Sequence, residues 1–230
     1  MIAKIPILIP VKQQSVRCPG KNYDLLPFTA RFIYNAGLEE YAVVITDSSE
    51  LSQFASRLGL KTYLEVRHQT QDELTSCKNY IEQNTIEYFF LCPVTQPFRD
   101  TCLFEMFMTK FKHIDQAWDF MTTITKIQDR SIFHLKQKDN RFVFEEESPN
   151  RKGSLCNQKY MIDGALYLIK SGFLKNVLAS PDPNHSFWDG DFLCIENEAP
   201  FLDIDTREDM SRFKFFEKYF SLIIKDEKMS

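Results

Sequence analysis

The chain has 230 residues, and its 28 lysines and arginines against 32 aspartates and glutamates give a formal net charge of −4. Hydrophobic residues make up 43% and charged residues 26%, a composition typical of a folded globular protein rather than a disordered one. A mildly acidic chain lacks the basic field that non-specific nucleic-acid binding requires. The length predicts a single domain over residues 1–230, with room for a small appendage.

The sequence predicts neither a membrane anchor nor a zinc site. No apolar run approaches the roughly 20 residues that span a bilayer. The apolar start, residues 1–14, is short and interrupted by prolines, so it fits a buried strand better than a signal peptide. None of the six cysteines forms a C-x-x-C pair, so we expect buried thiols in a reducing, cytoplasmic compartment.

Strand-like and helix-like patterns alternate over the first half of the chain. Apolar runs predict strands at 5–11, 41–46, 60–66, 88–92 and 118–127. Helical spacing predicts helices at 27–36, 49–58, 71–83 and 101–112, the first opened by Pro27 and the second capped by Asp47 or Ser48. This alternation with short links predicts a doubly wound α/β fold, a mostly parallel sheet with helices on both faces.

The pattern changes near residue 130. Short strand-like pieces at 132–135 and 141–144, joined by polar turns, predict a small inserted arm over residues 130–159. Strand patterns return at 160–169 and 200–204. Thr206 is placed to cap a last helix that runs to about Ile223.

The loop that leaves the first strand is the first candidate for chemistry, because ligands of such sheets bind at the carboxyl ends of the strands. This loop, Pro10–Asn22, contains Lys12, Arg17 and Lys21, with Ser15 as a hydroxyl donor. Three cations on a flexible loop can wrap a triphosphate. The alternative is a solvated loop whose cations point at water.

The second candidate is an acidic pair near the end of the chain. Asp203 and Asp205 alternate along a predicted strand, so both would face one side and offer oxygen ligands to Mg²⁺. An ordinary strand exit, with Asp205 capping the next helix, is the alternative. Two weaker candidates are the proline-rich loop 91–99, whose Arg99 is an anion contact or a structural link, and Arg67 with the hydroxyl residues of the next helix.

Five motifs occur in order along the chain: PxxxxSxRxPGKN, VVxTD, LxPxTxPxR, xGAxYxI and DIDTxED. Over roughly residues 4–215 this order resembles the acylneuraminate cytidylyltransferases, the CMP-sialic acid synthetases. The resemblance implies a nucleotide-diphospho-sugar transferase fold with a small dimerisation arm, and hence a homodimer. It also implies that CMP is transferred from CTP to the anomeric hydroxyl of an acidic nonulosonic sugar, with Mg²⁺ as cofactor and pyrophosphate as product.

The resemblance implies roles for individual residues. Nucleotide contacts would come from Lys12, Ser15, Arg17, Lys21 and Asn22, with Arg67 approaching the cytosine and Leu74 and Ser76 near the base pocket. Asp203 and Asp205 would hold Mg²⁺, and Arg17, Lys21 and Asp205 would act in catalysis. Sugar contacts would come from Cys92, Thr95, Gln96 and Asp163, and from Arg151 in the arm.

The sequence also departs from the family pattern. Gln13 and Gln14 replace a glycine pair, Val16 replaces a lysine, Cys92 replaces a glutamine and Asp163 replaces an asparagine. The lost cation removes a phosphate contact worth roughly 1–3 kcal/mol, and an acidic side chain at position 163 would repel an acidic sugar unless it is paired or protonated. Three alternatives therefore stay open: a relative that binds without turnover, a transferase for another sugar or base, and a glycosyltransferase.

Overall fold

The computed structural model describes residues 5–13, 15, 17–68, 71–129, 135–138, 141–144, 157–182 and 185–227. Its main strands are β1 (Ile7–Val11), β2 (Ala42–Thr46), β3 (Lys61–Leu64), β4 (Tyr88–Leu91), β5 (Phe120–Asp129), β8 (Asn157–Lys170) and β9 (Phe192–Glu196). Its α-helices are α1 (Lys21–Asn35), α2 (Ser49–Arg57), α3 (Glu73–Asn84), α4 (Leu103–Lys112), α5 (Ser171–Ala179) and α6 (Arg207–Glu227). Two 3₁₀ helices, η1 (Glu39–Tyr41) and η4 (Phe187–Asp189), and a separate hairpin of β6 (Leu135–Lys138) and β7 (Arg141–Phe144) complete the described elements.

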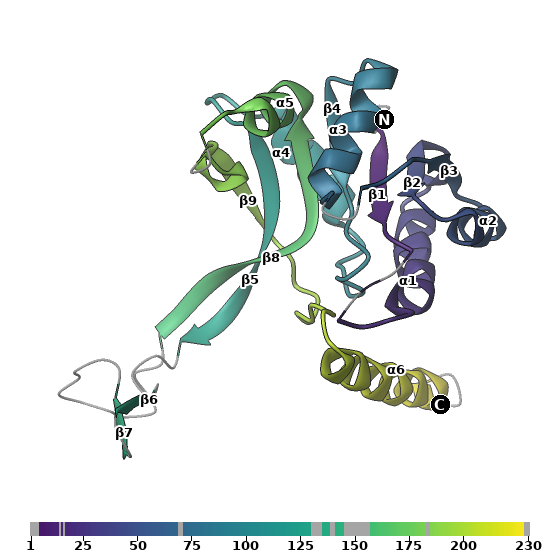
Figure 1. Ribbon diagram of the computed structural model, residues 1–230. Coiled ribbons are helices and arrows are strands. Elements are labelled where there is room, and N and C mark those ends of the chain that lie inside the picture. Colours follow the sequence, from purple (N-terminus) through teal and green to yellow (C-terminus); the bar gives the residue numbers. More distant parts are fainter. Residues whose placement is uncertain are drawn as a thin grey trace.

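The main strands form one sheet in the order β3-β2-β1-β4-β8-β5-β9 (Figure 1). Strand β8 runs antiparallel to its neighbours β4 and β5, while the other adjacent pairs are parallel. The predicted mostly parallel α/β sheet is confirmed. Strands β5 and β8 continue beyond the body as a two-stranded ribbon (Figure 1).

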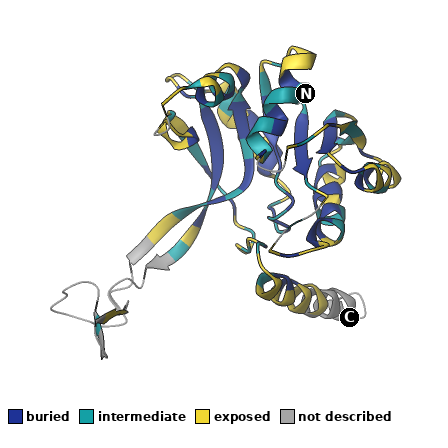
Figure 2. Cartoon of the chain, in the orientation of Figure 1, coloured by how far each residue is buried: buried dark blue, intermediate teal, exposed yellow. Residues whose placement is uncertain are grey.

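Helices cover both faces of this sheet, as predicted. Side chains alternate along a strand, so Ile7 and Ile9 of β1 pack into one cluster while Leu8 packs into the other. The first cluster also takes buried residues from α1, α2, α4 and α6, and the second takes them from α3 and α5. The central strands β1, β2 and β4 are therefore buried between two helical layers (Figure 2).

Two helices begin at the capping residues that the sequence indicates. The Ser48 side chain accepts a hydrogen bond from the backbone N–H of Leu51 at 3.2 Å, which caps α2. Thr206 Oγ1 accepts one from the backbone N–H of Asp209 at 3.2 Å, which caps α6. The cap of α6 fixes the direction in which the chain leaves the acidic pair.

Helix α1 begins six residues earlier than predicted, at Lys21 rather than Pro27. Gly20 precedes it with a φ of 83°, a left-handed conformation that glycine adopts without strain and that turns the loop directly into the helix. Pro27 lies inside the first two turns, where the chain gives up one backbone hydrogen bond. The early start places Lys21 and Asn22 on the helix rather than on the loop.

The second half of the chain differs from the predictions at several elements. The predicted strand at 200–204 is not a strand: Ile204 donates its backbone N–H to the Thr95 carbonyl at 3.0 Å, but no ladder forms. Helix α5 and strand β9 were not predicted. Within the part of the predicted arm that is described, β7 lies as expected and β6 lies three residues later than its predicted strand. The rest of 130–156 falls outside the described residues, so the dimerisation arm stays a prediction.

No helix among the described residues combines the length and the apolar character needed to cross a membrane.

Candidate nucleotide-binding site

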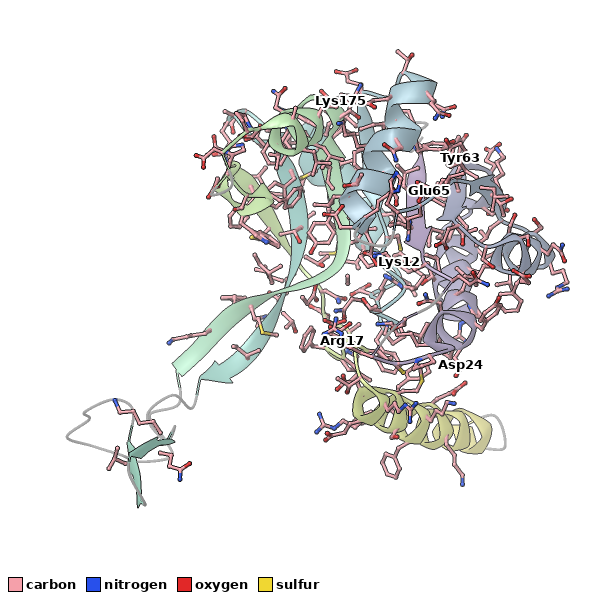
Figure 3. The ribbon with its side chains drawn as sticks, in the orientation of Figure 1. Lys12, Arg17, Asp24, Tyr63, Glu65 and Lys175 are labelled. Atoms are coloured by element: carbon pink, nitrogen blue, oxygen red, sulfur yellow. The ribbon has the colours of Figure 1, made fainter. Side chains whose placement is uncertain are left out.

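A cavity of about 420 Å³ opens at the carboxyl ends of β1 and β4. The first loop contributes its wall on one side and the segment before α6 contributes the other, although these lie at opposite ends of the sequence. Figure 3 shows Lys12 and Arg17 on this side of the molecule, with Arg17 beside the chain that leads into α6. The lining residues are Pro10, Lys12, Ser15, Arg17, Lys21, Asn22, Asp72, Glu73, Thr95, Asp203 and Asp205.

Two cations of the first loop and α1 meet one carboxylate of the acidic pair. Lys21 Nζ lies 3.2 Å from Asp205 Oδ1 and also donates to the Ile204 carbonyl at 2.7 Å. Arg17 Nη2 lies 2.8 Å from Asp205 Oδ2. The Lys21 side chain is only 8% exposed, whereas that of Arg17 is 67% exposed. Lys21 is therefore a fixed cation and Arg17 is one that can turn toward a ligand.

Hydrogen bonds to its own neighbours shape the first loop. Asn22 Nδ2 donates to the Lys12 carbonyl at 2.7 Å, which ties the end of β1 to α1. Ser15 Oγ accepts from the Cys18 N–H at 3.3 Å, and the Gln13 N–H donates to Asp47 Oδ1 at 2.9 Å. Gln14 and Val16 lie outside the described residues. Asn22, predicted as a direct nucleotide contact, thus also holds the loop in place.

Asp203 is exposed at the mouth of the cavity, and its environment disfavours its negative charge. Partial desolvation raises the pKa of Asp203, and the Asp205 carboxylate raises it further. A hydrogen bond with Thr95 and the Lys21 ammonium act in the opposite direction. A divalent cation between the two carboxylates would relieve their repulsion.

The residues present fit a Mg²⁺ ion that shares its coordination with a ligand. Mg²⁺ in nucleotide sites takes one or two carboxylates, and phosphate oxygens and waters complete its octahedron. Asp203 and Asp205 supply that pair on the wall of the cavity. In the described part of the chain, no group of three or more His, Cys, Asp or Glu side chains is arranged to hold a metal ion. The remaining ligands would therefore come from the substrate and from water.

Three residues near the cavity were not among the sequence predictions. Asp72 and Glu73 line it from the start of α3. Burial raises the pKa of Glu73, against the opposing effects of Arg67, Lys21 and Lys12. Burial also raises the pKa of Tyr167 to about 12, helped by the carboxylates of Asp163, Asp203 and Glu73 and opposed by a hydrogen bond with Thr122. Tyr167 belongs to the xGAxYxI motif, so the sequence contained a signal for it. Asp72 and Glu73 had no such signal, because their place beside the cavity depends on how α3 packs against the sheet.

Arg67 and Ser76, the predicted base contacts, do not line this cavity. Arg67 is buried in an ion pair with Glu65, and its Nη2 donates to Ser76 Oγ at 2.5 Å. Leu74 is partly buried against the second core cluster. Asp72 and Glu73, which do line the cavity, lie between Arg67 and Ser76 in the sequence. The base contacts stay a prediction.

Of the predicted sugar contacts, only Thr95 lines the cavity among the described residues. Cys92 is fully buried in the first core cluster, and burial raises the pKa of its thiol. Gln96 and Asp163 are 6% and 4% exposed. Arg151 lies outside the described residues. The structure thus offers no surface of Cys92 to a sugar, and the other sugar contacts stay predictions.

Asp163 is paired within the protein. Its Oδ1 accepts hydrogen bonds from the Thr123 hydroxyl and from the Ala165 N–H, and its Oδ2 accepts one from Asn197 Nδ2 at 2.8 Å. These bonds hold the irregular register between β5 and β8, next to Gly164, whose φ is 65°. The acidic residue at this position is therefore accounted for by the sheet, without a sugar.

Arg99 is a structural link rather than an anion contact. Its guanidinium donates from Nε to the Ala165 carbonyl at 2.9 Å and from Nη1 to Thr29 Oγ1 at 3.3 Å. It also bonds to the Pro93 carbonyl and stacks over Phe32 at 5.3 Å. Burial lowers the pKa of Arg99, an effect that the nearby Asp163 opposes.

No family model and no curated protein matches this sequence. Among solved structures, the chain is similar to CMP:2-keto-3-deoxy-manno-octonic acid synthetase complexed with CTP, with a TM-score of 0.66 and 15% identity, covering 97% of this chain and 100% of that one. It is also similar to a cytidylyltransferase from Leptospira borgpetersenii, with a TM-score of 0.60 and 15% identity over 90% and 83% of the two chains. The 4-diphosphocytidyl-2C-methyl-D-erythritol synthase from Anaerococcus prevotii gives a TM-score of 0.60 and 13% identity over 94% and 98%.

These likenesses show the fold. The chain has the nucleotide-diphospho-sugar transferase α/β fold, which it shares with solved cytidylyltransferases.

Proposed function

We propose that the protein is a cytidylyltransferase that transfers CMP from CTP to the anomeric hydroxyl of an acidic, sialic-acid-like nonulosonic sugar. One observation carries this proposal: the first-loop cations and the late acidic pair line the same cavity, with Lys21 and Arg17 both on Asp205. The fold shared with cytidylyltransferases supports the same chemistry.

In the reaction, the anomeric hydroxyl loses its proton to solvent as its oxygen attacks the α-phosphorus of CTP. The bond from the α-phosphorus to the bridging oxygen breaks, and pyrophosphate leaves with that oxygen. Catalysis then consists mainly of holding the two reactants in line and neutralising the charge that develops on the phosphates. Lys12, Arg17 and Lys21 would bind the phosphates, and Ser15 would donate its hydroxyl hydrogen to one of them. The Arg17 side chain is largely exposed, so it is free to exchange Asp205 for a phosphate.

Asp203 and Asp205 would hold Mg²⁺, which when bound supplies positive charge to the phosphate oxygens. For this task both carboxyls must be ionised. Lys21 assists because it stabilises the charge of Asp203, and Thr95 assists because it forms a hydrogen bond with the same carboxylate. Thr95 is also the predicted sugar contact that lines the cavity, so we place the acceptor beside it.

A second candidate is a relative that binds nucleotide or sugar without turnover. It is favoured by the ion pairs that already occupy both oxygens of Asp205, and by the glutamine at position 13 in place of glycine. A nucleotidyltransferase with another sugar or base is the third. The three candidates can be distinguished by the mixtures of nucleotide and sugar from which each would release pyrophosphate.

The test is a pyrophosphate-release assay with each of the four nucleoside triphosphates, Mg²⁺ and a panel of nonulosonic acids. We expect release with CTP and an acidic sugar, and a loss of roughly 100-fold or more in Asp205→Asn. Asp24→Asn is the matched control, since Asp24 forms an exposed surface pair with Lys214. Nucleotide binding without release in any mixture would support the second candidate, and release with another triphosphate would support the third.

A further inference from the structure

The start of α3 places two carboxylates on the wall of the cavity. Helix α3 connects β3 to β4, and both strands run in the same direction as β1, so the helix begins at the edge of the sheet where β1 and β3 end. It is held over β1 by Cys77, which packs in the same buried cluster as Leu8 (Figure 1). Asp72 and Glu73 therefore reach the cavity from the opposite face of the sheet to α1.

The two carboxylates differ in what they contact. Asp72 caps the helix, since its Oδ1 accepts the backbone N–H of Thr75 at 2.7 Å. Glu73 is half-buried and forms no hydrogen bond or ion pair with the residues that the structure describes. The first turn of a helix favours a negative charge, but this returns only part of the cost of removing a carboxylate from water. Glu73 is thus an acceptor that a ligand with O–H or N–H groups would satisfy.

The charges around Glu73 place it near the cations that we assign to the phosphates. Burial raises the pKa of Glu73, while Lys21 and Lys12 lower it, as does Arg67. Such effects decline with distance, and both lysines line the same cavity as Glu73. Glu73 cannot itself receive a phosphate, because both groups are negatively charged. It must therefore face a neutral part of the ligand that lies next to the phosphates.

The chemistry of a nucleotide indicates which part this is. An ionised carboxylate accepts hydrogen bonds and donates none. Cytidine triphosphate offers two sets of donors, the 2′- and 3′-hydroxyls of the ribose and the amino group of the base. The ribose is bonded to the α-phosphate through its 5′ oxygen, whereas the amino group lies at the far end of the molecule. Two neighbouring hydroxyls also match the two oxygens of one carboxylate, as in the dinucleotide sites of other α/β sheets.

We propose that Glu73 is a specificity-determining residue that receives the 2′- and 3′-hydroxyls of the ribose. The site then selects ribonucleotides over deoxyribonucleotides by means of a carboxylate that takes no part in holding the metal. This inference rests on the proposed function for its ligand, a nucleoside triphosphate, and extends that function to the discrimination of the sugar within the nucleotide.

The test is titration calorimetry of CTP, 2′-deoxy-CTP, 3′-deoxy-CTP and UTP, each with Mg²⁺, on the wild type, Glu73→Ala and Glu73→Gln. We expect the wild type to bind CTP at least about tenfold more tightly than either deoxy analogue, because a site that bonds a hydroxyl rejects the analogue without it. In Glu73→Ala this preference should fall to about threefold or less, with Glu73→Gln in between, since one acceptor oxygen remains. The CTP to UTP ratio should not change in either variant.

Glu82→Gln is the matched control, because Glu82 lies on the same helix in a partly exposed pair with Lys78. It should keep all the wild-type ratios. If Glu73→Ala does not fold, Glu73→Gln decides by the same preference for CTP over its deoxy analogues.

A wild type that does not prefer CTP over the deoxy analogues overturns the inference. So does a folded Glu73→Ala protein that keeps the wild-type preference, including one that binds every nucleotide more tightly by the same factor, since the carboxylate would then act on the phosphates alone. A change in the CTP to UTP ratio with no change in the deoxy ratios would place Glu73 on the base and also overturn it. A wild type that prefers CTP through Glu73, yet releases no pyrophosphate with any sugar, would remove the proposed function and support this inference.

Discussion

Asp205 forms two ion pairs in the cavity, because each of its carboxylate oxygens contacts a different cation. The Lys21 contact is buried on the lysine side and is supported by the Ile204 carbonyl, so it fixes the segment before α6 against α1. The Arg17 contact is largely exposed, and exposed ion pairs contribute only about 0–1 kcal/mol. A ligand can therefore displace Arg17 easily, while Lys21 stays in place.

The raised pKa of Asp203 makes the stability of the metal-free protein depend on pH. A carboxyl whose pKa is higher in the folded chain than in the unfolded chain weakens folding as the pH rises through the folded pKa. We expect Asp203→Asn to remove this loss. The melting temperature of the variant minus that of the wild type should therefore grow as the pH rises from about 4 to 7.

The measurement is a thermal melt series in chelator. Mg²⁺ should reverse the trend by stabilising the ionised pair in the wild type alone. A difference in melting temperature that stays constant, or shrinks as the pH rises, would contradict the raised pKa of Asp203.

The sequence predicts the charged walls of the cavity because the carboxyl ends of parallel strands share one edge. Lys12, Arg17, Lys21 and the acidic pair follow such ends or precede a helix at that edge, and the structure brings them together. The sequence could not indicate that the Asp163 side chain points into the protein. That position depends on the register shift between Thr122 and Ile124, which has no signature in a single sequence.

Among the elements, α6 matters most for the site, because it starts two residues after Asp205. Phe213 anchors it: the side chain is 1% exposed and its ring lies 4.9 Å from that of Phe28 and 5.8 Å from that of Phe98. Phe215, two residues on, is 68% exposed. The two phenylalanines thus form a natural pair for comparison.

We expect Phe213→Ala to lower the free energy of unfolding by about 3–5 kcal/mol, because it opens a cavity between α6 and the body. Phe215→Ala should stay within about 0.5 kcal/mol of the wild type. Urea denaturation of both variants measures the difference. Equal losses in the two variants would show that α6 is not anchored by Phe213.

Most elements of the first 130 residues could be predicted, because the spacing of apolar residues and the positions of capping residues indicate the same helices and strands. Helix α5 begins at Ser171, directly after the long strand β8 ends at Lys170, so no linker separates the two elements in the sequence. Segment 200–204 has the alternation of a strand, yet Ile204 reaches only the Thr95 carbonyl. A segment with a strand pattern joins a sheet only where a neighbouring strand has unpaired backbone groups, and the sequence does not reveal where such a strand lies.

At the scale of the whole molecule, the cavity is not simply a basic site. Three cations and four carboxylates line it, which matches the mild negative charge of the chain. A triphosphate alone would meet the carboxylate of Asp203, and also that of Asp205 once Arg17 turns from Asp205 toward the phosphates. A divalent cation changes this balance, so nucleotide and metal should bind together.

Titration calorimetry of CTP, with and without Mg²⁺, on the wild type and Asp205→Asn tests this account most directly. The wild type should bind CTP with Mg²⁺ at least about tenfold more tightly than CTP alone, since two carboxylates need the cation. In Asp205→Asn the gain from Mg²⁺ should largely disappear. Equal binding of CTP with Mg²⁺ by both proteins would contradict the assignment of Asp205 to the metal.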